Sequence, residues 1–89
     1  MHKILLVEDD PVIRQQVGKM LSEWGFEVVM VEDFMEVLTL FVQSEPHLVL
    51  MDIGLPLFNG YHWCQEIRKI SKVPIMFLSS RDQAMDIVM

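Results

Sequence analysis

Four short apolar runs alternate with segments of helical spacing, and this alternation is the strongest constraint on the fold. The runs are ILLV (4–7), VVMV (28–31), LVLM (48–51) and IMFL (75–78). They are continuous rather than alternating in polarity, which is typical of strands that helices cover on both faces. The sequence therefore predicts an α/β fold with a parallel sheet and right-handed crossover connections.

The segments between the runs predict three helices and the opening of a fourth. The first covers residues 11–24, after Asp10 as N-cap and before Gly25 as the terminating glycine. Its inward face is Ile13, Val17, Met20, Leu21 and Trp24. The second covers 34–43 after Asp33 as cap, and the third covers 60–70 after an Asn59–Gly60 turn, with Trp63, Ile67 and Ile70 on one side. Ser80 and Gln83 have the spacing of a capping box, so the last ten residues predict a further helix.

Length and composition limit the chain to one domain, residues 1–89, of a globular and cytoplasmic kind. The hydrophobic fraction is 52%, yet no apolar run approaches the roughly 20 residues that span a bilayer. Cys64 is the single cysteine, which excludes an internal disulfide and favours a reducing compartment. The net charge of −6 argues against direct nucleic-acid binding and suits a domain that binds cations or basic partners.

Acidic residues follow the first and third apolar runs. Glu8 and Asp9 come directly after the first run, and Asp52 ends the third. Ligands of open parallel sheets bind beyond the carboxyl ends of the strands, where the strand order reverses. If the first and third strands are neighbours there, the three carboxylates converge and repel one another unless a cation joins them. An all-oxygen donor set favours Mg²⁺, and Asp52 could then attack phosphorus to give an acyl phosphate.

Three motifs together resemble the receiver domain of bacterial two-component response regulators. They are ILLVEDDP, LVLMDIGLPLFNGY with its D-x-x-x-P-x-x-N-G spacing, and VPIMFLSSRD. The resemblance covers essentially the whole chain and implies a flavodoxin-like, doubly wound sheet of order 2-1-3-4. It implies that Asp52 accepts a phosphoryl group from a sensor histidine kinase. It also implies a Mg²⁺ site of Glu8, Asp9, Asp52 and the backbone carbonyl of Gly54, with Asp9 binding directly and Glu8 through water.

The resemblance carries further expectations about switching and output. Ser79 matches the switch hydroxyl that bonds the phosphoryl group. The EDD start and the SSRDQAMDIVM stretch resemble the branch in which a winged-helix DNA-binding domain follows the receiver, so transcriptional control would act through an output domain outside residues 1–89. Such a domain is a phospho-acceptor that assists its own phosphorylation and dephosphorylation, not an enzyme with a separate substrate.

One departure from the family pattern concerns the C-terminal side. The family's fifth strand–helix unit, with a lysine that contacts the phosphoryl group, has no counterpart in 1–89, so the domain is expected to be incomplete. IMFL would then be an open edge strand. The chain is accordingly predicted to self-associate through this strand or the fourth helix, or to be the ordered part of a longer polypeptide.

Three other functions compete with this interpretation. A phosphohydrolase of the haloacid-dehalogenase type needs a D-x-D arrangement after the first strand, which VEDDP lacks. A nucleotide-binding domain needs glycine in that loop, and EDDPVIR has none. A receiver-like module that works without phosphorylation, as an interaction or dimerisation surface, stays open because the family's lysine is missing.

Overall fold

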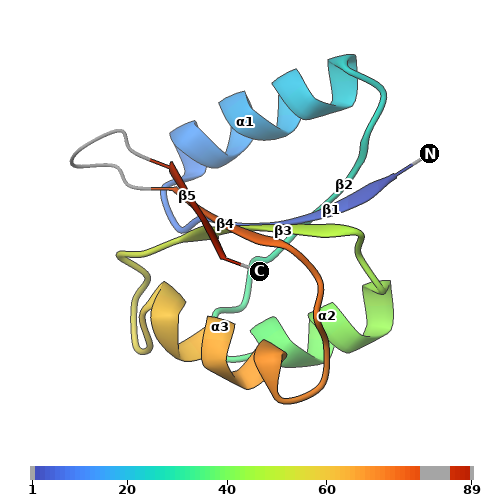
Figure 1. The fold of residues 1–89 in the computed structure, drawn as a ribbon. Coiled ribbons are helices and arrows are strands. Elements are labelled where there is room, and N and C mark those ends of the chain that lie inside the picture. Colours follow the sequence, from blue (N-terminus) through green and yellow to red (C-terminus); the bar gives the residue numbers. More distant parts are fainter. Residues whose placement is uncertain (1, 79–84, 89) are drawn as a thin grey trace.

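The computed structural model describes residues 2–78 and 85–88, which form an open sheet between helices (Figure 1). The elements are β1 (Lys3–Val7), α1 (Pro11–Glu23), β2 (Glu27–Met30), α2 (Val37–Ser44), β3 (Leu48–Asp52), α3 (Gly60–Arg68), β4 (Ile75–Leu78) and β5 (Met85–Val88). Each of the four apolar runs is a strand, to within one residue at either end. Among the described residues, no helix is long and apolar enough to cross a membrane.

The sheet has the order β2-β1-β3-β4-β5. Its first four strands are parallel, so the predicted order 2-1-3-4 is confirmed. The chain runs outward from β1 to β2, then crosses back to β3 on the other side of β1. The order therefore reverses between β1 and β3, and this reversal places the carboxyl ends of these two strands side by side.

The C-terminal segment differs from the sequence-based prediction. Residues 85–88 form β5, which pairs antiparallel with β4 in the register Ile75↔Val88 to Leu78↔Met85, so the helix predicted to include them is wrong there. The capping pair Ser80 and Gln83 lies outside the described residues. The outer backbone groups of β4 form hydrogen bonds with β5 and would otherwise be unpaired. The gain from this pairing is larger than the weak helical preference of a four-residue segment. IMFL is therefore not an edge strand, and the expected self-association through it loses its basis.

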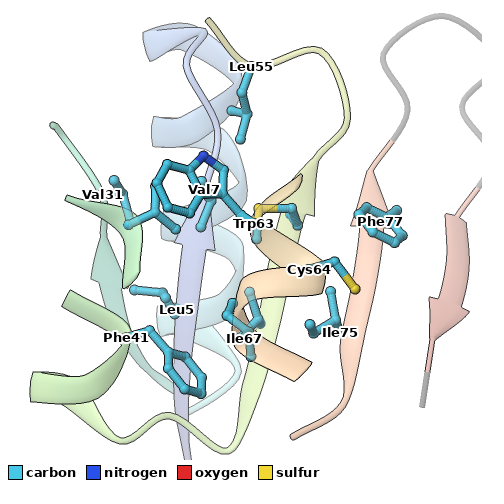
Figure 2. Close-up of a cluster of buried hydrophobic side chains, with 13 residues drawn as sticks. Leu5, Val7, Val31, Phe41, Leu55, Trp63, Cys64, Ile67, Ile75 and Phe77 are labelled. Carbon is cyan, nitrogen blue, oxygen red and sulfur yellow. The ribbon is translucent and has the colours of Figure 1, made fainter. Parts of the chain in front are cut away.

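The two faces of the sheet are covered unequally (Figure 1). Helices α2 and α3 lie on one face, where the main core forms around Leu5, Val49, Met51, Ile67 and Phe77, each at most 2% exposed (Figure 2). Of the described helices, only α1 lies on the other face, over a smaller cluster of Ile4, Leu6, Leu21 and Leu50. The strands are thus apolar on both faces, as continuous apolar runs predict.

Incomplete cover leaves an apolar groove of about 470 Å³ between α1 and the sheet. Met76 and Leu78 line it from β4, and both are only half-buried. Met20 of α1 and Trp24, the residue after α1, also line it and are 41% and 67% exposed, so their predicted burial is wrong. Helical spacing identified the correct face of α1, but no other described helix covers the sheet beside its C-terminal end.

The helix ends depend on local capping. Asp10 caps α1 by accepting the N–H groups of Val12 and Ile13, and Gly25 follows α1 with φ +92°, as predicted. Asp33 instead accepts the Met35 N–H in a turn, and α2 begins only at Val37. Helix α3 ends at Arg68, which leaves Ile70 57% exposed rather than inward.

Candidate metal and phospho-acceptor site

Strand pairing brings Glu8, Asp9 and Asp52 together at the carboxyl edge of the sheet. Val7 of β1 lies opposite Met51 of β3, so the next residues, Glu8 and Asp52, are side by side at the carboxyl ends of the two strands. Carboxylate oxygens from the three residues lie within 4.8 Å of one another. The convergence predicted from the sequence is therefore observed.

Glu8 is the most unusual of the three acids because it is only 2% exposed. Burial raises its pKa from 4.5 to about 7, and the neighbouring Asp52 carboxylate adds to the rise. The Asp10 backbone N–H opposes it by donating to Glu8 Oε2 over 3.1 Å. Arg14 contributes a more distant contact, from its Nη1 to the Glu8 carbonyl oxygen at 3.4 Å, which helical spacing does not reveal.

Asp52 is also buried, at 4% exposure, and its pKa is raised chiefly by that burial. The Gly54 N–H donates to Asp52 Oδ1 over 3.2 Å and holds the carboxylate against the start of the next loop. Asp9, by contrast, is exposed. The site thus combines two buried carboxylates whose pKa values are raised with a third carboxylate that is exposed.

Gly60 lies directly against the end of β3, a role that the sequence pattern does not predict. A Cβ at this position would overlap the Asp52 carbonyl oxygen and lie 2.9 Å from Met51 Cγ, so the first turn of α3 touches the end of β3. The Gly60 N–H donates to the Ile53 carbonyl oxygen over 3.0 Å and closes the intervening loop on itself. The Asn59–Gly60 pair was the available signal, but it indicated only a turn.

The donor set fits a hard divalent cation. Three carboxylates this close repel one another, and the pKa values of Glu8 and Asp52 are raised first by burial and further by neighbouring acids. All available side-chain ligands are oxygens, which suits Mg²⁺. Gly54 is exposed beside Asp52, where its carbonyl could complete the set. Ser79 lies outside the described residues, so its role as switch hydroxyl stays a prediction.

Substitution of Asp9 should weaken Mg²⁺ binding more than substitution of Glu8. Asp9 is exposed, whereas Glu8 is buried and one of its carboxylate oxygens already accepts the Asp10 N–H, which leaves Asp9 the freer of the two to contact the ion. Calorimetric Mg²⁺ titrations of Asp9→Ala and Glu8→Ala should therefore show the larger loss of affinity for Asp9→Ala. Equal affinities for the two variants and the unsubstituted chain would contradict this ligand assignment.

Comparison with known proteins gives a consistent family match. The sequence pattern of the response regulator receiver domain matches residues 4–89. The response regulator protein GraR of Staphylococcus haemolyticus is 46% identical over 87 residues, which are 98% of this chain and 39% of GraR. The chain therefore spans about two fifths of the length of the curated relatives it matches.

Solved structures agree with the sequence matches. The N-terminal domain of the nisin resistance regulator NsrR is 41% identical with a TM-score of 0.85, over 97% of this chain and 73% of that one. The response regulator TrrA, in complex with histidine kinase ThkA, is 34% identical with a TM-score of 0.82, over 90% and 70%. TrrA of Thermotoga maritima with Mg²⁺ and BeF is 35% identical with a TM-score of 0.85, over 92% and 72%.

Proposed function

Because the chain belongs to the response regulator receiver domain family of two-component signalling, we propose that Asp52 is its phospho-acceptor, with a histidine kinase as donor. The observation that carries this proposal is the position of Asp52, a buried carboxylate at the end of β3 within 4.8 Å of two further acids. Burial of a carboxylate beside two other acids lowers the stability of the fold, which favours a functional reason for an acid at this position.

The proposed reaction is a phosphoryl transfer between side chains. An Asp52 carboxylate oxygen attacks the phosphorus of a phosphohistidine and forms an O–P bond. The P–N bond breaks, and its electron pair returns to the imidazole, which leaves neutral because its other nitrogen carries a proton. The product is an acyl phosphate on Asp52, and the chain is the acceptor rather than an enzyme with a separate substrate.

Residues around Asp52 prepare this chemistry. The Gly54 N–H orients Oδ1, and the contact of Gly60 with the Asp52 backbone fixes the end of the strand. Glu8, Asp9, Asp52 and the Gly54 carbonyl would hold Mg²⁺. When bound, Mg²⁺ supplies positive charge that neutralises the transferring phosphoryl group. Ser79 is proposed to bond that group after transfer.

Labelling by a small acyl-phosphate donor tests the proposal. With acetyl phosphate and Mg²⁺, the chain should gain one phosphoryl group that hydroxylamine removes, and EDTA should prevent the gain. Absence of labelling in a folded chain that binds Mg²⁺ would contradict the proposal and favour the alternative, a receiver-like module that acts as an interaction surface without phosphorylation.

The role of the whole protein is a separate proposal. The curated relatives extend well beyond the matched region, and the EDD start resembles regulators with a winged-helix output domain. We therefore propose transcriptional control through a DNA-binding domain outside residues 1–89. Residues 1–89 themselves carry a net charge of −6, which disfavours contact with DNA phosphates. A cytoplasmic location is proposed because Cys64 is buried and free.

Self-association is proposed through the apolar groove rather than through β4. Every residue that lines the groove is apolar, and Trp24 at its rim is 67% exposed. A second copy would cover side chains that each gain roughly 1.5–3 kcal/mol on full burial. Light scattering should show a species of twice 10.4 kDa for residues 1–89, and Trp24→Glu should shift it toward the monomer.

The matched control is Val42→Glu, which places the same charge on an apolar residue of α2 that is 55% exposed and should leave the dimer intact. A monomer at all concentrations in the unsubstituted chain would contradict self-association. Equal effects of both substitutions would assign it to a different surface.

A further inference from the structure

A groove with a basic margin lies at the end of the sheet opposite Asp52. It has a volume of about 350 Å³ between the end of α2 and the residues after α3, and its lining is Phe41, Val42, Glu45, Pro46, Ile70 and Ser71. We propose that this groove, here called the basic groove, docks an acidic segment of a partner protein that presents one large apolar side chain. The proposal does not depend on the proposed function of Asp52.

Strand direction separates the basic groove from the acceptor. Pro46 comes shortly before β3 begins, and Asp52 ends that strand. The strand has 5 residues, so its two ends are roughly 17 Å apart. Figure 1 shows the chain after α3 passing α2 on its way to β4, at the end of the sheet where the parallel strands begin. A partner in the basic groove therefore leaves the route to Asp52 open.

Two exposed apolar side chains line the basic groove from different segments. Val42 of α2 is 55% exposed, and Ile70, beyond the end of α3, is 57% exposed. The packing of the two helices does not depend on them, because Phe41 and Ile67 are the buried residues at these levels of α2 and α3. Single exposed apolar residues are ordinary, but two that line one groove indicate a contact surface.

The margin of the basic groove on the α3 side is positively charged. The segment RKISK, residues 68–72, surrounds Ile70 with the cations Arg68, Lys69 and Lys72 and contains no acid, whereas the whole chain has a net charge of −6. Lys69 bonds Glu66 over 2.7 Å in an exposed pair, which contributes little to stability and can exchange its partner. Lys72 is exposed and has no hydrogen-bond or ion-pair partner among the described residues.

Helix capping accounts for only part of this charge. Arg68 and Lys69 lie at the C-terminal end of α3, where cations complement the partial negative charge of the helix. Lys72 lies beyond that end, so the helix does not explain it. Ile70 is exposed among these cations, so burial within the chain does not explain it either. Both residues therefore favour a use outside the fold.

The combination of charge and groove selects an acidic protein segment. A large apolar side chain can enter beside Val42 and Ile70, and carboxylates next to it can pair with Lys69 and Lys72. Glu45 lines the α2 side of the basic groove, so the acids of the partner belong on the α3 side. Nucleic acid fits less well, because its binding depends on phosphate contacts and makes no use of an apolar groove. The net charge of −6 also opposes a nucleic acid or an anionic membrane.

Selection from a library of random short peptides tests the proposal. The unsubstituted chain is the immobilised target, and an Ile70→Ser/Lys72→Glu double variant is present in excess in solution to remove peptides that bind elsewhere, such as in the apolar groove under α1. The retained peptides should combine aspartate or glutamate with leucine or an aromatic residue. Each single substitution should weaken their binding roughly tenfold in fluorescence polarisation, as expected for loss of an interface anchor. Binding should also weaken as NaCl rises from about 0.05 M to about 0.5 M.

The controls address position, charge and folding. Val12→Ser and Lys19→Glu make similar changes at exposed residues of α1 and should leave the peptide affinity unchanged. Glu45→Gln should leave the affinity equal or increase it, because it removes the acid that lines the basic groove. Asp52→Asn should bind the peptides normally, because the acceptor lies at the other end of β3. Thermal melting followed by circular dichroism establishes that each variant is folded.

Three results would overturn the proposal. They are a selection that retains no peptide, retained peptides that are basic or neutral, and acidic peptides that bind the single variants as tightly as the unsubstituted chain. Lys72→Glu changes an exposed side chain, so it keeps the test valid if Ile70→Ser lowers the stability. Binding to duplex DNA or to anionic phospholipid vesicles that Lys72→Glu abolishes, with no peptide retained, would assign the surface to a phosphate-bearing partner instead.

Discussion

Asp52→Asn should abolish phosphorylation, with labelling by acetyl phosphate reduced at least about a thousandfold. The amide has nearly the shape of the carboxylate but lacks the anionic oxygen that attacks phosphorus. The Gly54 N–H can still donate to the amide oxygen, so the loop should keep its course. The measurement is the mass gain of the intact chain after incubation with Mg²⁺ and acetyl phosphate, with hydroxylamine reversal.

Asp10→Asn is the matched control for this substitution. It makes the same chemical change two residues from Glu8, at an exposed N-cap where asparagine serves as well as aspartate. It should be labelled at the normal rate. Undiminished labelling of Asp52→Asn would mean that a different carboxylate accepts the phosphoryl group.

Stability of the metal-free chain should fall as the pH rises from about 4.5 to about 7. The folded state holds a proton on Glu8 up to a pKa of about 7, whereas an unfolded glutamate releases it near 4.5. The folded state therefore binds more protons in this window, and the free energy of unfolding decreases as pH increases. The raised pKa of Asp52 acts in the same direction. For Glu8, whose pKa rises from 4.5 to about 7, the loss is on the order of 3 kcal/mol.

Urea unfolding at a series of pH values in EDTA measures this dependence. Glu8→Gln cannot titrate and should show a much flatter profile, while the three histidines stay the same in both proteins. Saturating Mg²⁺ should remove the decrease in the unsubstituted chain, because the ion binds the deprotonated carboxylates. A profile for Glu8→Gln parallel to that of the unsubstituted chain would show that Glu8 is not the group responsible.

Features that depend on long, repeated patterns could be predicted from the sequence. Each of the four continuous apolar runs is a strand, because burial on both faces requires that pattern. The convergence of Glu8, Asp9 and Asp52 followed from one topological rule about where parallel strands end. The cap at Asp10 and the terminating Gly25 followed from local backbone chemistry.

Features decided by a distant partner could not be predicted in this way. Residues 85–88 are a strand because β4 offers a free edge, and their own sequence does not reveal that pairing. Asp33 can cap a helix or a turn, and here it bonds the Met35 N–H in a turn. Trp24 has the spacing of a buried residue, yet among the described residues it lines an open apolar groove and is 67% exposed.

The tight contact at Gly60 couples the end of β3, where Asp52 lies, to the start of α3. Only hydrogen fits between the Gly60 Cα and the Asp52 carbonyl, so there is no slack through which the end of β3 could move alone. A displacement of the Asp52 backbone should therefore move the first turn of α3 as well. Tyr61 lies on that turn, is 50% exposed and is in ring contact with Phe77 of β4, so its environment should change with such a displacement. A small movement at the end of β3 would thus change the position of the exposed side of α3.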